Sequence, residues 1–312
     1  MPRKLFGFCK IREHDNPLVN AAVKLFNKKM TIIKKWLKWE KFIKFMPAQP
    51  NKNIALKSFV KQVPWLHQSL RFFYWQGRSL RDRFLGTTAQ ERYWRNRHRH
   101  KNDDWNDTSR FWHNRDWAKS YWSSISHPHR QFLLKHINRL APFNNLLEIG
   151  ANCGPNLYIL AKKFPQSAFR GIDINPAAVE FGQKHFEKLG IHNVNLEVGR
   201  ADQLDKFSDK SFDIIITDAV LIYIAPDKIK RVIQDMIRVS RKALVFLEQH
   251  QEFLRKDNRG LGAYQFGLWQ RNYRRLLGQF LPQEKIKLTK LPPKLWPDKN
   301  WSQAGYVIKA FL

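Results

Sequence analysis

The chain has 312 residues, 43% of them hydrophobic, and carries 56 Lys and Arg side chains against 26 Asp and Glu, a formal net charge of +30. This length accommodates one α/β domain of about 200 residues together with an appendage. Two cysteines, Cys9 and Cys153, cannot form a disulfide framework, no apolar run is long enough to span a membrane, and the N-terminus lacks the apolar core of a secretory signal. We therefore expect a cytoplasmic protein.

The basic charge is concentrated at the N-terminus, where residues 1–101 hold 24 basic and five acidic side chains, a net charge of +19. This asymmetry predicts a basic, aromatic-rich helical extension over residues 1–100 and a separate folded domain over residues 101–312. Residues 23–45 and 58–84 place apolar and basic side chains on different faces of a helix. Such helices suit the surface of an anionic membrane, but they could also pack on the domain or bind nucleic-acid phosphates.

The segment from residue 91 to residue 130 is rich in aromatic side chains and contains two His-x-His pairs. A metal site also needs a third and a fourth converging ligand, and the nearby Asp103, Asp104 and Asp107 are common enough to be coincidental, so we predict no metal. Residues 117–137 are predicted to begin a helix that leads into the first strand. Tyr121, Trp122 and Arg130 are candidates for a lid or an acceptor pocket, although ordinary aromatic packing would explain each of them equally well.

A glycine-bearing turn follows the first predicted strand, in the sequence Leu-Leu-Glu-Ile-Gly-Ala-Asn-Cys-Gly-Pro-Asn-Leu at residues 146–157. A second apolar run ends in Asp173, 23 residues after Gly150. Strand, glycine turn, helix and a second strand with a terminal acid predict a site for an adenosine-type cofactor. Gly150 and Gly154 would let the backbone approach the ligand, and Asp173 is placed to accept hydrogen bonds from a ribose diol.

The pattern Glu148-x-Gly150-x-Asn152-x-Gly154 resembles the first motif of class I S-adenosylmethionine-dependent methyltransferases, and in particular a subgroup associated with bacterial surface-glycan biosynthesis. Asn152 stands where the motif usually has glycine, and asparagine tolerates left-handed backbone angles. The resemblance covers residues 110–312 and implies S-adenosylmethionine as the cofactor. It implies the following cofactor-binding residues: Glu148, Gly150, Asn152, Gly154, Asp173, Ile174, Ala201, Asp202 and Asp218.

Later segments resemble the remaining motifs of the same family. Residues 198–204 resemble the third motif, with Arg200 at the usual acidic position and Asp202 two residues later, and residues 211–224 resemble the fourth. Further extended runs are predicted at residues 243–247, 284–290 and 304–312. The resemblance therefore implies an α/β, Rossmann-like fold whose seven-stranded, mostly parallel sheet has an antiparallel C-terminal pair.

Methyl transfer requires an in-line nucleophile, exclusion of water and usually a base for the proton of the nucleophile. Ligands of open parallel sheets bind at the carboxyl ends of the strands. His250, which follows the fifth predicted strand, is the leading candidate for a general base because a neutral imidazole accepts a proton near pH 7. Asp218 is the alternative base, and His250 could instead cap the strand end.

The acceptor pocket is predicted from aromatic and basic side chains near the same edge. Tyr223 stands where glycan-associated relatives often have histidine. Residues 268–273 are predicted to open a late helix beside the acceptor, where an aromatic ring and an arginine would suit a sugar with an anionic group, although helix-start packing is an equal alternative. The candidate substrate residues are Tyr121, Trp122, Arg130, Tyr223, Trp269, Arg271 and Tyr273.

The leading functional hypothesis is O-methylation of a saccharide or lipid-linked glycan at the cytoplasmic face of a membrane, with the basic extension on the membrane surface. It rests on the resemblance and on the extension. The first alternative is an RNA methyltransferase that holds phosphates with the basic extension. The second is a non-catalytic protein that keeps the fold. The sequence does not indicate an oligomeric state.

Overall fold

The computed structural model describes residues 87–97, 117–254, 261–265 and 268–312. The helices predicted at residues 23–45 and 58–84 lie outside these ranges, and so does most of the basic extension. The extension therefore stays a prediction, and the structure that follows is that of the C-terminal domain with one preceding helix.

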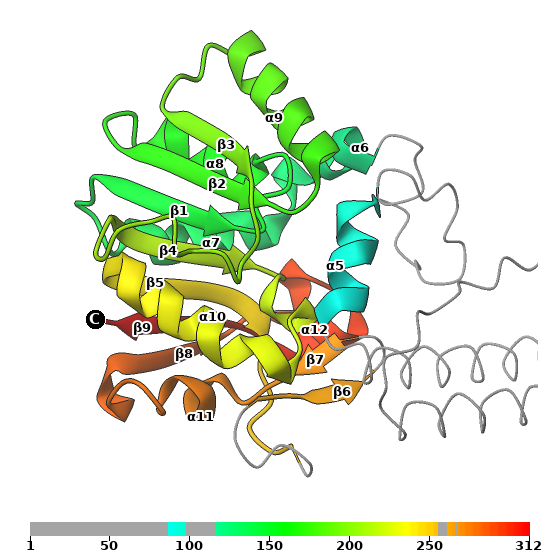
Figure 1. The fold of residues 1–312 in the computed structure, drawn as a ribbon, viewed down its shortest axis with the longest axis vertical. Helices are drawn as coiled ribbons and strands as arrows, with labels where there is room; N and C mark the ends of the chain where they lie inside the picture. The colour runs from blue at the N-terminus through cyan, green and yellow to red at the C-terminus, as the bar shows by residue number, and fades with distance from the viewer. Residues whose placement is uncertain (1–86, 98–116, 255–260, 266–267) are drawn as a thin grey trace, which may run out of the picture. The chain divides into compact units, whose positions relative to one another are not determined.

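A seven-stranded sheet forms the centre of the domain, with the strand order β3-β2-β1-β4-β5-β9-β8 (Figure 1). The five strands β3, β2, β1, β4 and β5 run parallel to one another, whereas β9 pairs antiparallel with both β5 and β8. The strands are β1 (Asn145–Ile149), β2 (Ala168–Asp173), β3 (Val194–Val198), β4 (Phe212–Asp218), β5 (Ser240–Gln249), β8 (Ile286–Lys290) and β9 (Gly305–Phe311). This topology confirms the predicted fold class, including the antiparallel C-terminal pair.

Helices connect the strands and cover the sheet. The α-helices are α5 (Thr87–Arg95), α6 (Trp117–Ser123), α7 (Pro128–Asn138), α8 (Pro155–Lys163), α9 (Pro176–Lys188), α10 (Pro226–Val239), α11 (Tyr273–Leu277) and α12 (Lys299–Ala304). Short 3-10 turns lie at η2 (Ser124–Ser126), η3 (Leu221–Tyr223), η4 (Gln283–Lys285) and η5 (Pro293–Leu295). Proline occupies the first position of α7, α8, α9 and α10, where its missing N–H has no partner to lose.

The helix predicted from residue 117 onward is interrupted before α7. His127 adopts an extended conformation, with φ −64° and ψ 129°. The reason is Pro128, since the ring of a proline disfavours helical angles in the preceding residue. The interruption gives α7 a new N-terminus and places the two histidines of the His-Pro-His stretch together at its start.

The apolar core has two layers, one on each face of the sheet. Alternate residues of the central strands point to opposite faces, as the pleat requires. On one face, Leu147, Ile215 and Leu244 pack with α10, and on the other, Leu146, Ile214 and Val245 pack with α7 and α8. Strand β4 is buried on both faces, which is typical of the centre of a doubly covered sheet.

A small two-stranded sheet pairs β6 (Ala263–Gln265) with β7 (Leu268–Gln270). Trp269 therefore lies on a strand and not, as predicted, at the start of a helix. The late helix, α11, begins at Tyr273.

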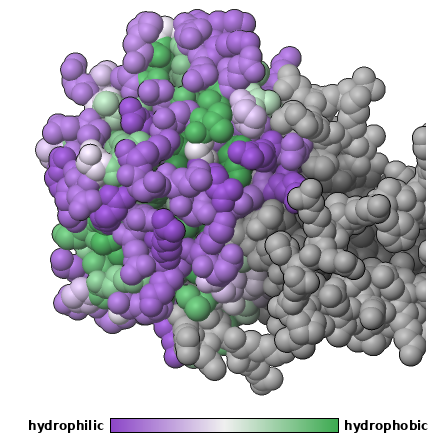
Figure 2. All heavy atoms as spheres, in the orientation of Figure 1, coloured by the Kyte–Doolittle hydropathy of each residue, from purple (hydrophilic) through white to green (hydrophobic). Residues whose placement is uncertain are grey.

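Within the described ranges, no helix is long and apolar enough to cross a membrane. Figure 2 shows one face of the molecule, on which hydrophilic side chains predominate over the described residues.

Candidate active site

The turn after β1 brings the backbone close to neighbouring elements. Gly150, Asn152 and Gly154 have positive φ angles of 75°, 53° and 83°, so the left-handed conformation predicted for Asn152 is confirmed. A Cβ on Gly150 would lie 2.3 Å from Val220, and one on Gly154 would lie 2.8 Å from Phe186. In this structure, glycine is therefore required by close packing of the turn against the protein itself.

Asp173 ends β2 beside this turn, and backbone donors hold its carboxylate. Its Oδ2 accepts a hydrogen bond from the Asn152 N–H and its Oδ1 accepts one from the Asn175 N–H, each at 2.8 Å. Burial raises the pKa of Asp173 to about 6 in spite of these hydrogen bonds. A carboxylate oxygen can accept more than one hydrogen bond, so the fixed carboxylate keeps acceptor capacity for a diol.

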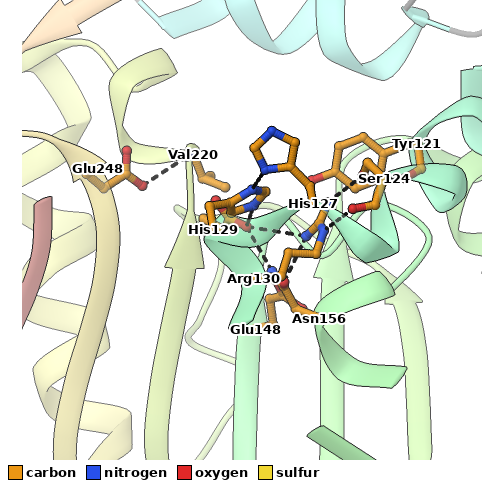
Figure 3. A network of polar contacts seen from close by, with 10 residues as sticks. Tyr121, Ser124, His127, His129, Arg130, Glu148, Asn156, Val220 and Glu248 are labelled. Carbon is orange, nitrogen blue, oxygen red and sulfur yellow. Dashed lines mark hydrogen bonds and ion pairs between the residues drawn. The ribbon is translucent and has the colours of Figure 1, made fainter. Parts of the chain in front are cut away.

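Glu148 near the end of β1 and Asp218 at the end of β4 are joined by one asparagine, Asn156, which Figure 3 shows beside Glu148. The Asn156 amide donates to Glu148 Oε1 at 2.7 Å and to Asp218 Oδ2 at 3.0 Å. Arg130 donates to the Asn156 carbonyl oxygen at 2.8 Å and to Asp218 Oδ2 at 3.3 Å. The second oxygens, Glu148 Oε2 and Asp218 Oδ1, are buried and have no hydrogen-bond partner among the described residues.

The two carboxyl groups differ in charge because their surroundings differ. Burial raises the pKa of Glu148 to about 8, and the hydrogen bond from Asn156 only partly opposes this effect. Burial alone would also raise the pKa of Asp218, but His129, Arg130 and Asn156 outweigh it and bring that pKa to about 2. At neutral pH the pair therefore consists of a protonated Glu148 and an ionised Asp218.

A pair of histidines extends this network from Asp218. His129 Nε2 lies 3.0 Å from Asp218 Oδ2, and His129 Nδ1 lies 2.5 Å from His127 Nδ1. Burial lowers the pKa of both imidazoles, that of His127 to about 4, so both are neutral at pH 7. The ring of Trp296 lies 4.3 Å from that of His129 and stacks on Trp301 at 4.0 Å, which fixes the plane of the buried imidazole.

Helix α5 reaches the same edge of the sheet through ion pairs and rings. Glu91 pairs with Arg200 at 2.6 Å and with Lys228 at 2.8 Å, and both cations also contact Asp202. Hydrogen bonding from Arg200, followed by that from Lys228, holds the pKa of Asp202 well below its usual range. The predicted adenine contact of Asp202 thus involves a carboxylate that already has two cationic partners, and it stays a prediction.

His250 lies at the start of a different network. Its Nδ1 accepts a hydrogen bond from the Tyr273 N–H at 3.1 Å, and its Nε2 lies 2.8 Å from Glu252 Oε2. Since Nδ1 accepts, the hydrogen of the neutral ring is on Nε2 and is donated to Glu252. Both ring nitrogens of His250 are therefore occupied, and neither has a free lone pair that could take a proton from the methyl acceptor. The arrangement therefore does not favour the predicted role of His250 as a base.

Two predicted substrate residues are buried beside His250. Arg271 and Tyr273 are both 0% exposed. The Arg271 guanidinium donates to the carbonyl oxygens of Leu221, Ile224 and Leu261, and so ties η3 to the loop before β6. In this conformation neither side chain is accessible to a substrate.

The other predicted pocket residues lie in aromatic contacts. Trp122 packs α6 against α8 and α9, since its ring contacts those of Tyr158, His185 and Phe186. The remaining contacts are Tyr121 with Arg130 and Trp117, Tyr223 with Trp94, and Trp269 with Tyr264. Ile174 follows β2 and Ala201 follows β3, and both are half-buried.

The site contains residues that the motif analysis did not assign. Asn156 bridges the two carboxylates, His129 contacts Asp218, Trp296 stacks on His129, and Glu91 connects α5 to the domain. Asn156 directly follows the glycine turn, and His129 belongs to the His-Pro-His-Arg stretch, so the sequence contained a local signal for both. Trp296 and Glu91 come from distant segments and have no such signal.

The central part of the domain is similar to known methyltransferases. Residues 144–278 match the family model described as a methyltransferase domain. Protein-L-isoaspartate O-methyltransferase of Pyrococcus horikoshii is 33% identical over 97 residues, which are 31% of this chain and 43% of that protein. The chain therefore spans less than half the length of this curated relative.

Solved structures with a similar fold have low sequence identity. A SAM-dependent methyltransferase from Aquifex aeolicus matches 62% of this chain and 97% of its own, with a TM-score of 0.42 and 16% identity. Geranyl diphosphate C-methyltransferase from Streptomyces coelicolor matches 59% of this chain and 74% of its own, with a TM-score of 0.45 and 15% identity. The predicted enzyme class and its S-adenosylmethionine cofactor agree with the match of residues 144–278 to the methyltransferase domain model.

Proposed function

We propose that the protein transfers the methyl group of S-adenosylmethionine to a hydroxyl group of a saccharide or lipid-linked glycan. The observation that carries the proposal is the set of three carboxyl groups at the carboxyl ends of β1, β2 and β4. Glu148, Asp173 and Asp218 all border the glycine turn. Ligands of open parallel sheets bind at this edge, where the strand order reverses.

The donor set fits the cofactor. Asp173 is fixed by two backbone N–H groups and offers its oxygens to the ribose hydroxyls. The buried, unpartnered Oδ1 of the ionised Asp218 suits a ligand that has positive charge or N–H donors. When bound, S-adenosylmethionine supplies a methyl group that its sulfonium has already activated. The chain itself has to orient the acceptor, exclude water and take up a proton.

The finer assignment of the acceptor rests on sequence. The stretch Trp117-x-x-x-Tyr121-Trp122, followed by His127-Pro-His-Arg, resembles the segment before the first motif in glycan-associated relatives. The basic extension, with a net charge of +19 over residues 1–101, suits the anionic surface on which lipid-linked glycans are held. The same charge favours RNA as the second candidate acceptor, since phosphate contacts dominate nucleic-acid affinity.

The cofactor assignment is tested by Asp173→Ala. The substitution removes charge-assisted hydrogen bonds to the ribose and should weaken S-adenosylmethionine binding by about 2–4 kcal/mol. Asp205→Ala, at an exposed acid, is the matched control and should bind like the wild type. Isothermal calorimetry measures both. An Asp173→Ala protein that folds and binds with unchanged affinity would contradict the cofactor assignment.

The acceptor is tested by incubating the purified full chain with methyl-labelled S-adenosylmethionine and four acceptor classes: nucleotide sugars, lipid-linked glycans, RNA and DNA. We expect label in the carbohydrate fractions. Label found only in RNA would replace the glycan acceptor and leave methyl transfer in place. Cofactor binding without transfer to any class would favour the non-catalytic alternative.

A further inference from the structure

The His127–His129–Asp218 chain has a geometry that determines which atoms carry hydrogen. Asp218 is ionised and can only accept, so His129 Nε2 must be the donor at 3.0 Å. His129 is neutral, so its Nδ1 carries a lone pair and must accept at the 2.5 Å contact. His127 Nδ1 is therefore the donor in that contact. Of the two imidazole rings, the remaining nitrogen lone pair is therefore that of His127 Nε2.

This lone pair faces away from the network. Figure 3 shows the ring of His127 above that of His129, with its second nitrogen directed away from the other labelled side chains. His127 is half-buried, whereas His129 and Arg130 are buried. Among the described residues, the contact with His129 is the only hydrogen bond of the His127 ring, and the backbone of His127 bonds separately to Ser124 and Arg130. The lone pair of His127 Nε2 is thus at the outer end of a buried series of hydrogen bonds. The inner end of this series is the carboxylate of Asp218.

The groups packed around the His127–His129–Asp218 hydrogen bonds keep the carboxylate ionised and in place and the imidazoles neutral. Arg130 donates to Asp218 and also to the Ser124 backbone carbonyl at 3.0 Å and the Ser124 hydroxyl at 2.8 Å, so it cannot leave the carboxylate freely. Asn156 also donates to Asp218, and Trp296 covers the His129 ring. Burial, then His129 and Arg130, oppose positive charge on His127, whereas Asp218 favours it. The imidazole is consequently neutral until a proton arrives from a bound acceptor.

We infer that His127 is the general base for the proposed methyl transfer, with His129 and Asp218 as positioning residues, and that the acceptor is a neutral hydroxyl group. The inference rests on the proposed function. The acceptor hydroxyl loses its proton to His127 Nε2 as its oxygen bonds to the methyl carbon. The carbon–sulfur bond breaks, and its electron pair stays on sulfur. The sulfonium charge disappears as an imidazolium forms, and Asp218 stabilises that imidazolium through His129.

This arrangement also restricts the class of acceptor. A carboxylate has no proton to lose at neutral pH and would gain nothing from the chain, whereas an alcohol with a pKa far above neutrality must lose its proton as the new bond forms. The three residues come from two elements that are far apart in sequence, the start of α7 and the end of β4. Their convergence is therefore a property of the fold and not of a local motif.

The test is the tautomeric state of the two histidines in the full chain labelled with 15N-histidine. Long-range 1H–15N spectra distinguish a protonated from an unprotonated ring nitrogen. Signals are assigned by the loss that His127→Gln and His129→Gln each produce, with His192→Gln, at an exposed histidine, as the control. We expect His127 to carry its hydrogen on Nδ1 and His129 on Nε2. A hydrogen on Nε2 of His127 would overturn the inference, because the outward nitrogen would have no lone pair.

Two additions separate this inference from the proposed function. Asp218→Asn removes the charge at the far end and should shift the tautomer populations of both histidines, while a spectrum unchanged in that variant would show that Asp218 does not orient them. Binding of S-adenosylhomocysteine to the wild type, measured by calorimetry, tests the cofactor site alone. Absence of binding would sink the proposed function, whereas binding with the opposite tautomer would sink only the role of His127.

Discussion

Two histidine sites border the carboxyl edge of the sheet, and they differ in what their neighbours leave free. At His250, a backbone N–H occupies one nitrogen and Glu252 occupies the other. At His127, one nitrogen donates inward to His129 and the other keeps its lone pair. Position at the strand ends is thus not enough to make a base. What matters is whether the surrounding donors and acceptors consume both ring nitrogens.

The two halves of the carboxyl edge around these histidines differ in what their polar groups hold. Around β5 and β7, Glu248 Oε1 accepts from Thr217 and from the Val220 and Leu221 N–H groups, each at 2.9 Å. Arg271 then binds the carbonyl oxygens on the other side of η3. These contacts fix η3, and Val220 packs in turn against Gly150. The β5–β7 half is therefore a supporting half that holds the turn in place, although Glu248 Oε2 has no hydrogen-bond partner among the described residues. The β1–β2–β4 half is a presenting half, which places Glu148, Asp173 and Asp218 beside the glycine turn.

The largest expected effect contrasts the two histidines directly. His127→Gln should lower the methyl-transfer rate by about 10²–10⁴-fold, the usual range for the loss of a general base, with S-adenosylmethionine affinity little changed. His250→Gln should leave turnover of the folded protein almost unchanged. It should lower the free energy of unfolding by about 1–3 kcal/mol, because it disturbs a buried hydrogen bond to Tyr273.

Turnover with labelled cofactor and urea unfolding, measured on the same preparations, check both variants. The reverse pattern, in which the His250 variant is stable but inactive and the His127 variant keeps full activity, would return the base to the fifth strand. Loss of activity in both variants with intact cofactor binding would mean that the two halves of the edge act together.

The fold could be predicted well from the sequence because its signals are local. The strand at residues 145–149, the glycine turn and the strand ending in Asp173 occur within one short segment, and each has its own pattern. Trp269 was placed wrongly, on a helix and not a strand. The segment at 268–270 is only three residues long and pairs with an equally short partner, so no periodicity could show it.

The site was less predictable, because its chemistry depends on pairings between distant segments. His250 and Asp218 were placed correctly at strand ends, but what each contacts is decided elsewhere. Tyr273 occupies one nitrogen of His250 from 23 residues away, and His129 reaches Asp218 across 89 residues. Nothing in the local sequence distinguishes a histidine with a free nitrogen from one without.

A smaller effect than the loss of turnover concerns Glu148 in the presenting half, and its size depends on pH. In the folded protein, burial raises the pKa of Glu148 to about 8 from its ordinary value of 4.5. Between these values the folded state binds more protons than the unfolded state, so this group's contribution to stability is fully present below about pH 4.5 and is lost as the pH rises through 8. Glu148→Gln removes the titration and keeps an oxygen that can accept from Asn156.

The variant should therefore unfold at a higher temperature than the wild type at pH 8, by the equivalent of about 2–4 kcal/mol, and the difference should shrink toward pH 5. The same change should weaken S-adenosylmethionine binding, since a cationic ligand favours the ionised carboxylate that glutamine cannot supply. Glu197→Gln, on β3 and paired with Lys206, is the control for a simple loss of negative charge. A Glu148→Gln protein that is less stable at pH 8 would show that the buried carboxyl group stabilises the fold, and the distinction between a presenting half and a supporting half would then fail at its central residue.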